Sequence, residues 1–119
     1  MTELPTLNDV ALRLAALSRD LDKATSDADT LDSRAVAARH AYEIAYSRAF
    51  LSAEGSMDVR KHKAVLETAD ARLNAEIADQ VLRACRARIG TIRMQIETGR
   101  SLSAAVRAEI SLAGTGIAP

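Results

Sequence analysis

Apolar residues recur at alternating steps of three and four from residue 7 to residue 49. Thirteen successive positions on this rule are apolar, beginning with Leu7 and ending with Ala49. Since roughly half of the chain is apolar, chance produces such a run on the order of once in 1,000 sequences when every register is allowed. A spacing of 3.5 residues held over six heptads is typical of a coiled-coil seam. The pattern therefore predicts one long helix over residues 7–53.

A short turn is predicted over residues 54–58. Gly55 suits the position just after a helix C-terminus, and Ser56 or Asp58 is a suitable cap for the helix that follows. At the other end, Thr6 is expected to cap the first helix. The first helix is therefore bounded by polar or glycine signals at both ends.

The second helix is predicted to run from about residue 58 to residue 112, with less strict apolar spacing than the first. Gly90 and Gly99 lie inside it, and each costs about 1 kcal/mol relative to Ala. Gly99 leaves open a break near residue 99, followed by a short helix over 102–112. Residues 113–119 have no periodicity and are predicted to be a flexible tail.

Two long helices joined by a short turn lie side by side and antiparallel. The predicted fold is therefore all-α: a cap segment over residues 1–6, then a long antiparallel two-helix coiled-coil hairpin over 7–112. One such hairpin has little interior, and the second helix is apolar on more than one stripe, so two copies are expected to dimerise into a four-helix bundle. The residues predicted to form the hairpin or oligomer seam are Leu7, Val10, Leu14, Leu17, Leu21, Leu31, Tyr42, Leu66, Leu73, Ile77, Val81, Ile92, Ile96 and Val106.

Charge is balanced overall, with 16 basic and 16 acidic residues, so no global field attracts nucleic acid or a membrane. Four arginines nevertheless recur every seven residues on one flank of the second helix. The antiparallel pairing places acidic residues of the first half beside them. The arginines are Arg86, Arg93, Arg100 and Arg107, and the acids beside them are, in the same order, Asp27, Asp20, Asp9 and Glu3.

Two interpretations of this arginine row stay open. The first is a coiled-coil flank that pairs with the acidic first helix, which the balanced charge favours. The second is a stripe that contacts phosphates of nucleic acid or a partner, together with bases at the turn. The candidate contact residues for the second interpretation are Arg83, Arg86, Arg93, Arg100, Arg107, Arg60, Lys61 and Lys63.

Three aromatic residues, Tyr42, Tyr46 and Phe50, are spaced by four on one helical face. Such a row is either a platform for stacking bases or the packed end of the hairpin. Because Tyr42 lies in the predicted seam, the packed end is favoured.

The remaining candidates for chemistry do not form a recognisable site. Three aspartates over residues 27–32 lack the glycine and the final glutamate of a calcium loop. His40 and His62 have no partners at zinc-ligand spacing, and no histidine follows Cys85 to act as its base. The chain is therefore predicted to have no catalytic residue, no metal ligand and no cofactor, and not to be an enzyme.

Three segments, residues 41–61, 84–93 and 99–109, resemble small helical proteins encoded by tailed phages of Gram-positive bacteria. The resemblance covers roughly residues 35–112 and lies in the spacing of alanine and arginine around the turn and along the second helix. It implies a phage or prophage origin, often near replication and recombination genes. It carries over no catalytic or binding residue.

These observations lead to an expected function and location. The chain is expected to be a non-enzymatic phage accessory protein that acts through protein–protein contacts of a coiled-coil scaffold, for instance on host or phage DNA metabolism. The alternative is a direct nucleic-acid-binding protein that uses the arginine row. The expected partners are a second copy and a host or phage protein. The absence of a signal peptide or an apolar span, and the single cysteine, point to the bacterial host cytoplasm.

Overall fold

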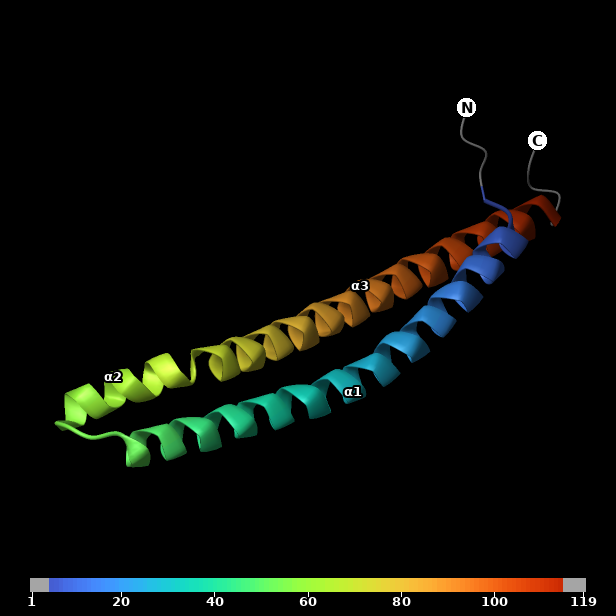
Figure 1. Cartoon of the computed structure of the whole chain (residues 1–119). Helices are drawn as coiled ribbons and strands as arrows, with labels where there is room; N and C mark the ends of the chain where they lie inside the picture. Colours follow the sequence, from blue (N-terminus) through green and yellow to red (C-terminus); the bar gives the residue numbers. More distant parts are fainter. Residues whose placement is uncertain (1–4, 115–119) are drawn as a thin grey trace. The chain divides into compact units, whose positions relative to one another are not determined.

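All regular secondary structure in the described part of the chain, residues 5–114, is helical (Figure 1). The computed structural model contains α1 (Leu7–Ser52), α2 (Met57–Glu67) and α3 (Ala69–Gly114). The predicted all-α class is confirmed. The predicted cap segment and tail fall partly on residues 1–4 and 115–119, which lie outside the described residues.

Contacts divide the chain into two units, which are described separately. Unit 1 comprises the chain up to Thr25 together with the chain from Ala87 onward, so it holds the first part of α1 and the last part of α3. Unit 2 is Ser26–Arg86, which contains the rest of α1, all of α2 and the beginning of α3.

A reciprocal pair of hydrogen bonds caps the beginning of α1. The Thr6 N–H donates to Asp9 Oδ2 at 3.0 Å, and the Asp9 N–H donates to Thr6 Oγ1 at 3.1 Å. This is a capping box with aspartate at the third helical position. The backbone and side-chain bonds to Thr6 lower the pKa of Asp9 below its ordinary value of 3.8. The contribution of the cap to the stability of the fold is therefore complete at pH values above the ordinary pKa of Asp9. It is lost as the pH falls through the lowered pKa.

The turn between α1 and α2 depends on one glycine and one serine. Gly55 has φ of +118°, a conformation that side chains with a Cβ rarely adopt. The Ser56 side chain then accepts a hydrogen bond from the Val59 N–H at 3.3 Å and so caps α2. The turn thus lies within residues 53–56 and overlaps the predicted segment 54–58.

The second helix is interrupted at Thr68, whereas the sequence predicted an unbroken helix from 58 or a break near Gly99. Thr68 has φ of −108° and ψ of 14°, and both its N–H and its hydroxyl donate to the Ala64 carbonyl, the hydroxyl at 2.6 Å. A threonine hydroxyl that bonds the carbonyl four residues back disturbs helical geometry. The visible offset between α2 and α3 in Figure 1 lies at this residue.

α3 continues through Gly99, where the sequence left a break open. This glycine has a packing role in unit 1. A Cβ built at Gly99 would lie 2.7 Å from Leu14 Cδ2 and 3.3 Å from Leu14 Cγ. A Cβ at Gly90 would meet nothing within 4 Å. Gly99 therefore makes room for Leu14, and Gly90 has no such neighbour.

The strict apolar spacing of α1 marks its buried side. All thirteen positions on the rule, from Leu7 to Ala49, are buried or half-buried. In unit 1 the most buried residue is Leu17, at 2% exposure, and in unit 2 it is Ala35, at 1%.

The buried side of α2 and α3 also follows steps of three and four, but its composition differs between the units. In unit 1 the fully buried residues are Ile89, Ile92 and Ile96. In unit 2 most of the buried and half-buried residues of α2 and α3 are small, namely Ala64, Thr68, Ala71, Ala75, Ala78 and Cys85, and Leu82 is the large aliphatic one among them. The buried side of α3 in unit 1 therefore carries large aliphatic side chains, and the buried side of α2 and α3 in unit 2 carries mainly alanine.

The burial of Leu17 predicts that Leu17→Asp unfolds unit 1. Truncation of a buried leucine alone costs about 2–5 kcal/mol, and a buried carboxylate costs more. The control is Leu12→Asp, because Leu12 is 62% exposed in the same helix. Thermal melts followed by circular dichroism should show a large loss for Leu17→Asp and almost none for Leu12→Asp. Equal melting temperatures would contradict the assigned seam.

The two helical glycines provide a matched pair. Gly90→Ala is expected to raise the free energy of unfolding by about 1 kcal/mol, because alanine favours the helix and the site is open. Gly99→Ala is expected to gain much less or to destabilise, because its methyl group meets Leu14. Urea unfolding of both variants measures the difference. An equal gain at the two sites would show that the close approach to Leu14 is absent.

Candidate functional site

Large apolar side chains line the outward side of α2 and the start of α3 in unit 2. This outer stripe consists of Val59, Leu66, Leu73, Ile77 and Val81, with exposed fractions of 44, 78, 53, 50 and 45%. A step of seven places Val59 and Leu66 on one face of α2, and steps of four place Leu73, Ile77 and Val81 on one face of α3, each about half a turn from the buried alanines of its helix. The stripe contains five of the ten large apolar residues that are exposed in unit 2.

Leu66, Leu73, Ile77 and Val81 were predicted as seam residues, but they do not lie in the contact with α1. The α2–α3 segment has two apolar sides, one of small residues and one of large residues. α1 packs on the small side, where Ala64 is fully buried. Small side chains at a contact let two helix axes approach closely. Apolar spacing alone does not say which of the two sides meets α1.

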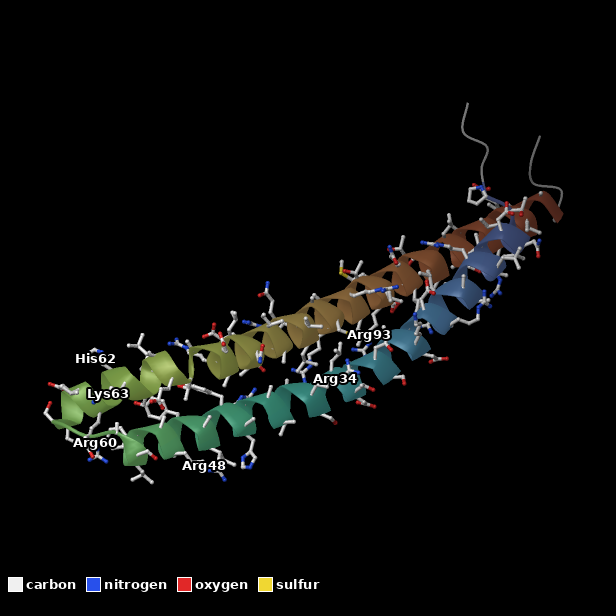
Figure 2. All side chains as sticks on the ribbon, viewed as in Figure 1. Arg34, Arg48, Arg60, His62, Lys63 and Arg93 are labelled. Carbon is white, nitrogen blue, oxygen red and sulfur yellow. The ribbon has the colours of Figure 1, made fainter. Side chains whose placement is uncertain are left out.

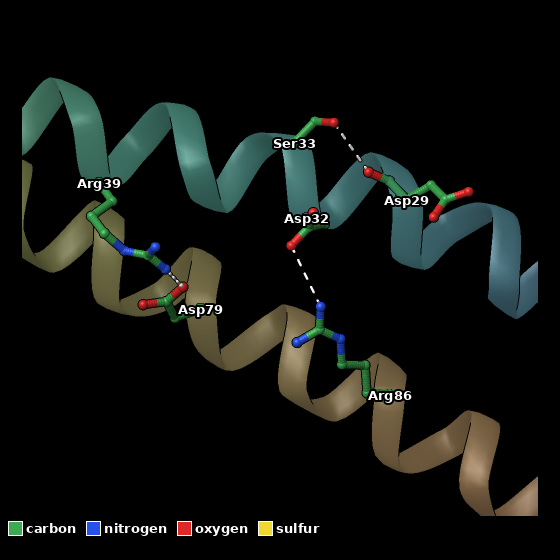
Figure 3. Close-up of polar contacts among 6 residues, drawn as sticks. All are labelled: Asp29, Asp32, Ser33, Arg39, Asp79 and Arg86. Atoms are coloured by element: carbon green, nitrogen blue, oxygen red, sulfur yellow. Dashed lines mark hydrogen bonds and ion pairs between the residues drawn. The ribbon is translucent and has the colours of Figure 1, made fainter.

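Two ion pairs join α1 to α3 within unit 2 (Figure 3). Arg39 Nη2 lies 2.8 Å from Asp79 Oδ1, and Arg86 Nη2 lies 3.5 Å from Asp32 Oδ1. All four side chains are at least a third exposed, so each pair contributes only about 0–1 kcal/mol. Their main effect is to favour one alignment of the two helices. Asp27, the predicted partner of Arg86, is not the residue that Arg86 contacts; both ion pairs join positions whose numbers sum to 118, whereas the predicted pair sums to 113.

The ion pairs border an open groove of about 470 Å³. Its lining residues are Asp32, Val36, Arg39, Asp79, Leu82, Arg83 and Arg86. Because carboxylates already hold two of its three arginines, an incoming phosphate would have to break those pairs. Arg83 forms no ion pair with any described residue. The groove is therefore a weak candidate for anion binding.

The rest of the arginine row is not paired as the charge pattern predicted. Within residues 5–114, Arg93, Arg100 and Arg107 make no ion pair. Asp9, the acid expected beside Arg100, is instead bonded to Thr6. The acid expected beside Arg107, Glu3, lies outside the described residues.

Arg93 and Arg100 line a small pocket in unit 1 together with Leu21, Ile96 and Glu97. Pairing with the first helix therefore accounts for Arg86 and not for Arg93 or Arg100, which stay open to other partners.

Two of the bases near the turn are engaged with the end of α1 (Figure 2). Arg60 donates through Nε and Nη2 to the Phe50 carbonyl at 3.2 and 3.1 Å, and its guanidinium lies 4.5 Å from the centroid of the Phe50 ring. Lys63 Nζ donates to the Glu54 carbonyl at 3.1 Å. These contacts satisfy carbonyls that the helix end leaves without partners. Arg60 and Lys63 thus hold the turn, whereas Lys61 is exposed.

The aromatic row lies against the same turn. The Tyr42 and Tyr46 rings are 6.3 Å apart at 61°, and the Tyr46 and Phe50 rings are 6.5 Å apart at 20°. All three residues are half-buried, and Arg60 covers the Phe50 ring. The rings contact one another and the arginine, which is the arrangement expected for a packed end and not for an open base-stacking platform.

The described residues include no group of three or more histidine, cysteine, aspartate or glutamate side chains placed to hold a metal ion. In the same part of the chain, no helix has the length and hydropathy needed to cross a membrane. Cys85 is half-buried, and His40 and His62 are exposed.

Comparison with protein-family models, with curated proteins and with solved structures gave no match to this chain. The candidate functional features are therefore those of the molecule itself: the outer stripe and the arginines of the row that pair with no acid among the described residues.

The contacts of Arg60 predict that Arg60→Ala destabilises unit 2. The variant loses a cation–π contact and two charge-assisted hydrogen bonds, together about 1–3 kcal/mol. Lys61→Ala removes an exposed base beside it and is expected to change stability by less than about 0.5 kcal/mol. Urea unfolding curves distinguish the two variants. The same stability for both would mean that Arg60 does not hold the turn.

Proposed function

We propose that this chain is a non-enzymatic phage accessory protein that acts through protein–protein contacts of an antiparallel helical hairpin. The observation that carries the proposal is the outer stripe, because proteins seldom leave a row of leucine, isoleucine and valine facing water unless another surface covers it. Host or phage DNA metabolism is the process we propose it acts on, in the cytoplasm of a bacterial host.

Contacts in unit 2 support the antiparallel hairpin. Asp32 comes before Arg39 in α1, but its partner Arg86 comes after Asp79, the partner of Arg39, in α3. The order of the contacts is therefore opposite in the two helices. The short turn centred on Gly55 is compatible with the same arrangement. The phage origin is supported by the resemblance of residues 35–112 to small helical phage proteins.

A second candidate function is direct nucleic-acid binding. It is favoured by Arg93 and Arg100, which make no ion pair with any residue of 5–114, so that no acid of that range competes with phosphates for their guanidinium groups. The zero net charge, and Glu97 beside these arginines, favour protein contacts instead.

Capture of partners from infected cells tests the two functions together. A tagged chain is purified from the infected bacterium with and without nuclease treatment of the extract. Under the proposed function, a specific protein partner remains bound after nuclease treatment. Under the second function, whatever is captured is released by the nuclease, because nucleic acid bridges it to the chain.

Gel shifts with purified protein complete this test. Single- and double-stranded DNA at two salt concentrations should show no salt-sensitive shift under the proposed function. A shift at low salt that disappears with Arg93→Glu/Arg100→Glu, and survives the matched double variant Arg13→Glu/Arg19→Glu, would overturn the proposed function in favour of DNA binding.

A further inference from the structure

We infer that the outer stripe is the surface on which a second copy of this chain packs. The inference deepens the proposed function, because it names the first protein that the exposed side of unit 2 contacts. It rests on four observations: the composition of the unit 2 core, the area of the stripe, the symmetry of its centre and its charge.

The buried side chains that α2 and α3 contribute to unit 2 are mainly small, and the large apolar residues of the stripe are not among them. α1 contributes alanines such as Ala35 and Ala49 to the buried side, and the facing helices contribute Ala64 and Ala75. A buried alanine removes one methyl group from water, whereas a buried leucine or isoleucine removes four carbon atoms. The large aliphatic residues of α2 and α3 in unit 2 therefore lie mainly on the outside, in the stripe, whereas Leu82 is buried.

The stripe is large enough for a specific interface between two copies. Weighted by their exposed fractions, its five residues present about 500 Å² of apolar surface, near the top of the ~300–600 Å² range for the largest patch of a monomer. Two copies that face each other would bury about 1,000 Å², the lower limit for a specific protein interface.

Only the centre of the outer stripe is symmetric about residue 75, because Leu66, Val59 and Val81 correspond there to Ala84, Thr91 and Ala69, which lie outside the stripe. Leu66 and Leu73 precede that residue by nine and two positions, and Ile77 and Ala84 follow it by two and nine. A twofold axis at this point would place Leu73 on Ile77 of the second copy and Leu66 on Ala84 of the second copy. An isologous dimer requires this kind of self-complementary surface, and an unrelated partner does not.

Charge does not oppose this pairing. The helical segment 57–86 carries six basic and five acidic residues, and the whole chain has a formal net charge of zero. Two copies therefore approach without overall electrostatic repulsion.

The test is the mass of the full chain in solution. Sedimentation equilibrium of the wild type should give about twice the chain mass of 12.7 kDa. The double variant Leu73→Glu/Ile77→Glu should give the mass of a single chain with an unchanged helical spectrum, because both side chains point away from α1. The control Leu12→Glu/Met94→Glu places two acids at exposed positions outside the stripe and should stay dimeric.

Cross-linking tests the symmetry with the stripe residues intact. In a Cys85→Ala background, a cysteine is introduced by Asn74→Cys or by His62→Cys, and a short bismaleimide is added. With the axis at residue 75, the two copies of position 74 are neighbours. The two copies of position 62 are then separated by 26 residues, roughly 39 Å along the helix. Dimer bands at position 74 and none at position 62 are expected, and bands at position 62 would overturn this packing.

The outcomes separate the inference from the proposed function. If Leu73→Glu/Ile77→Glu remains a dimer, the stripe is not the interface. If the wild type is a single chain at every concentration, no second copy packs there. In either case a nuclease-resistant protein partner captured from cells would leave the proposed function standing. A wild-type dimer that captures no other protein would uphold the inference and overturn the proposed function.

Discussion

Small side chains between the helices of unit 2 constrain where its large apolar residues lie. Ala35 and Ala49 of α1, and Ala64 and Ala75 of the facing helices, are buried. Small side chains let helix axes approach closely and leave little room for large residues in the contact, where Leu82 is the buried leucine of the described residues of unit 2. The large aliphatic residues of α2 and α3 in unit 2 therefore lie mainly on the opposite side, in the outer stripe.

In unit 1, large side chains are buried between the helices. The buried residues include Leu17, Ile92 and Ile96, and Leu14 packs where Gly99 provides room. This unit buries several large side chains within one chain, although Leu12 and Met94 are exposed. Hydrophobic stabilisation follows the apolar area that is removed from water. Large aliphatic residues therefore contribute more of the buried area in unit 1 than on the α2–α3 side of unit 2.

Much of this fold was predictable from the sequence, because α1 has a single apolar side. Its thirteen spaced positions from Leu7 to Ala49 are the ones that the structure buries, and Gly55 and Ser56 mark the turn. The second arm was not predictable in the same way. Ala64, Ala71, Ala75 and Ala78 also follow steps of three and four, but they overlap with the more hydrophobic leucines and isoleucine. Hydrophobicity alone ranks the larger residues first, and only the contact with α1 decides between the two sides.

The polar contacts were also only partly predictable from the sequence. The sequence indicates that arginines of the second arm meet acids of the first, but it does not give the alignment of the two helices, in which Arg86 meets Asp32. The helix is interrupted at Thr68, whose hydroxyl bonds the Ala64 carbonyl, whereas Thr91 and Thr98 make the same kind of bond inside the unbroken α3. Threonine within a helix permits such a bond but does not require it. Local competition of this kind becomes visible only when the backbone geometry is known.

The central claim is that the outer stripe is covered in solution. The most direct measurement is methyl NMR with a soluble paramagnetic agent, which broadens signals in proportion to their access to solvent. In the single chain, Leu73 and Ile77 are about as exposed as Leu12, at 53, 50 and 62%. The account predicts that the methyl signals of Leu73 and Ile77 are protected while those of Leu12 are strongly broadened. Equal broadening of all three would contradict it.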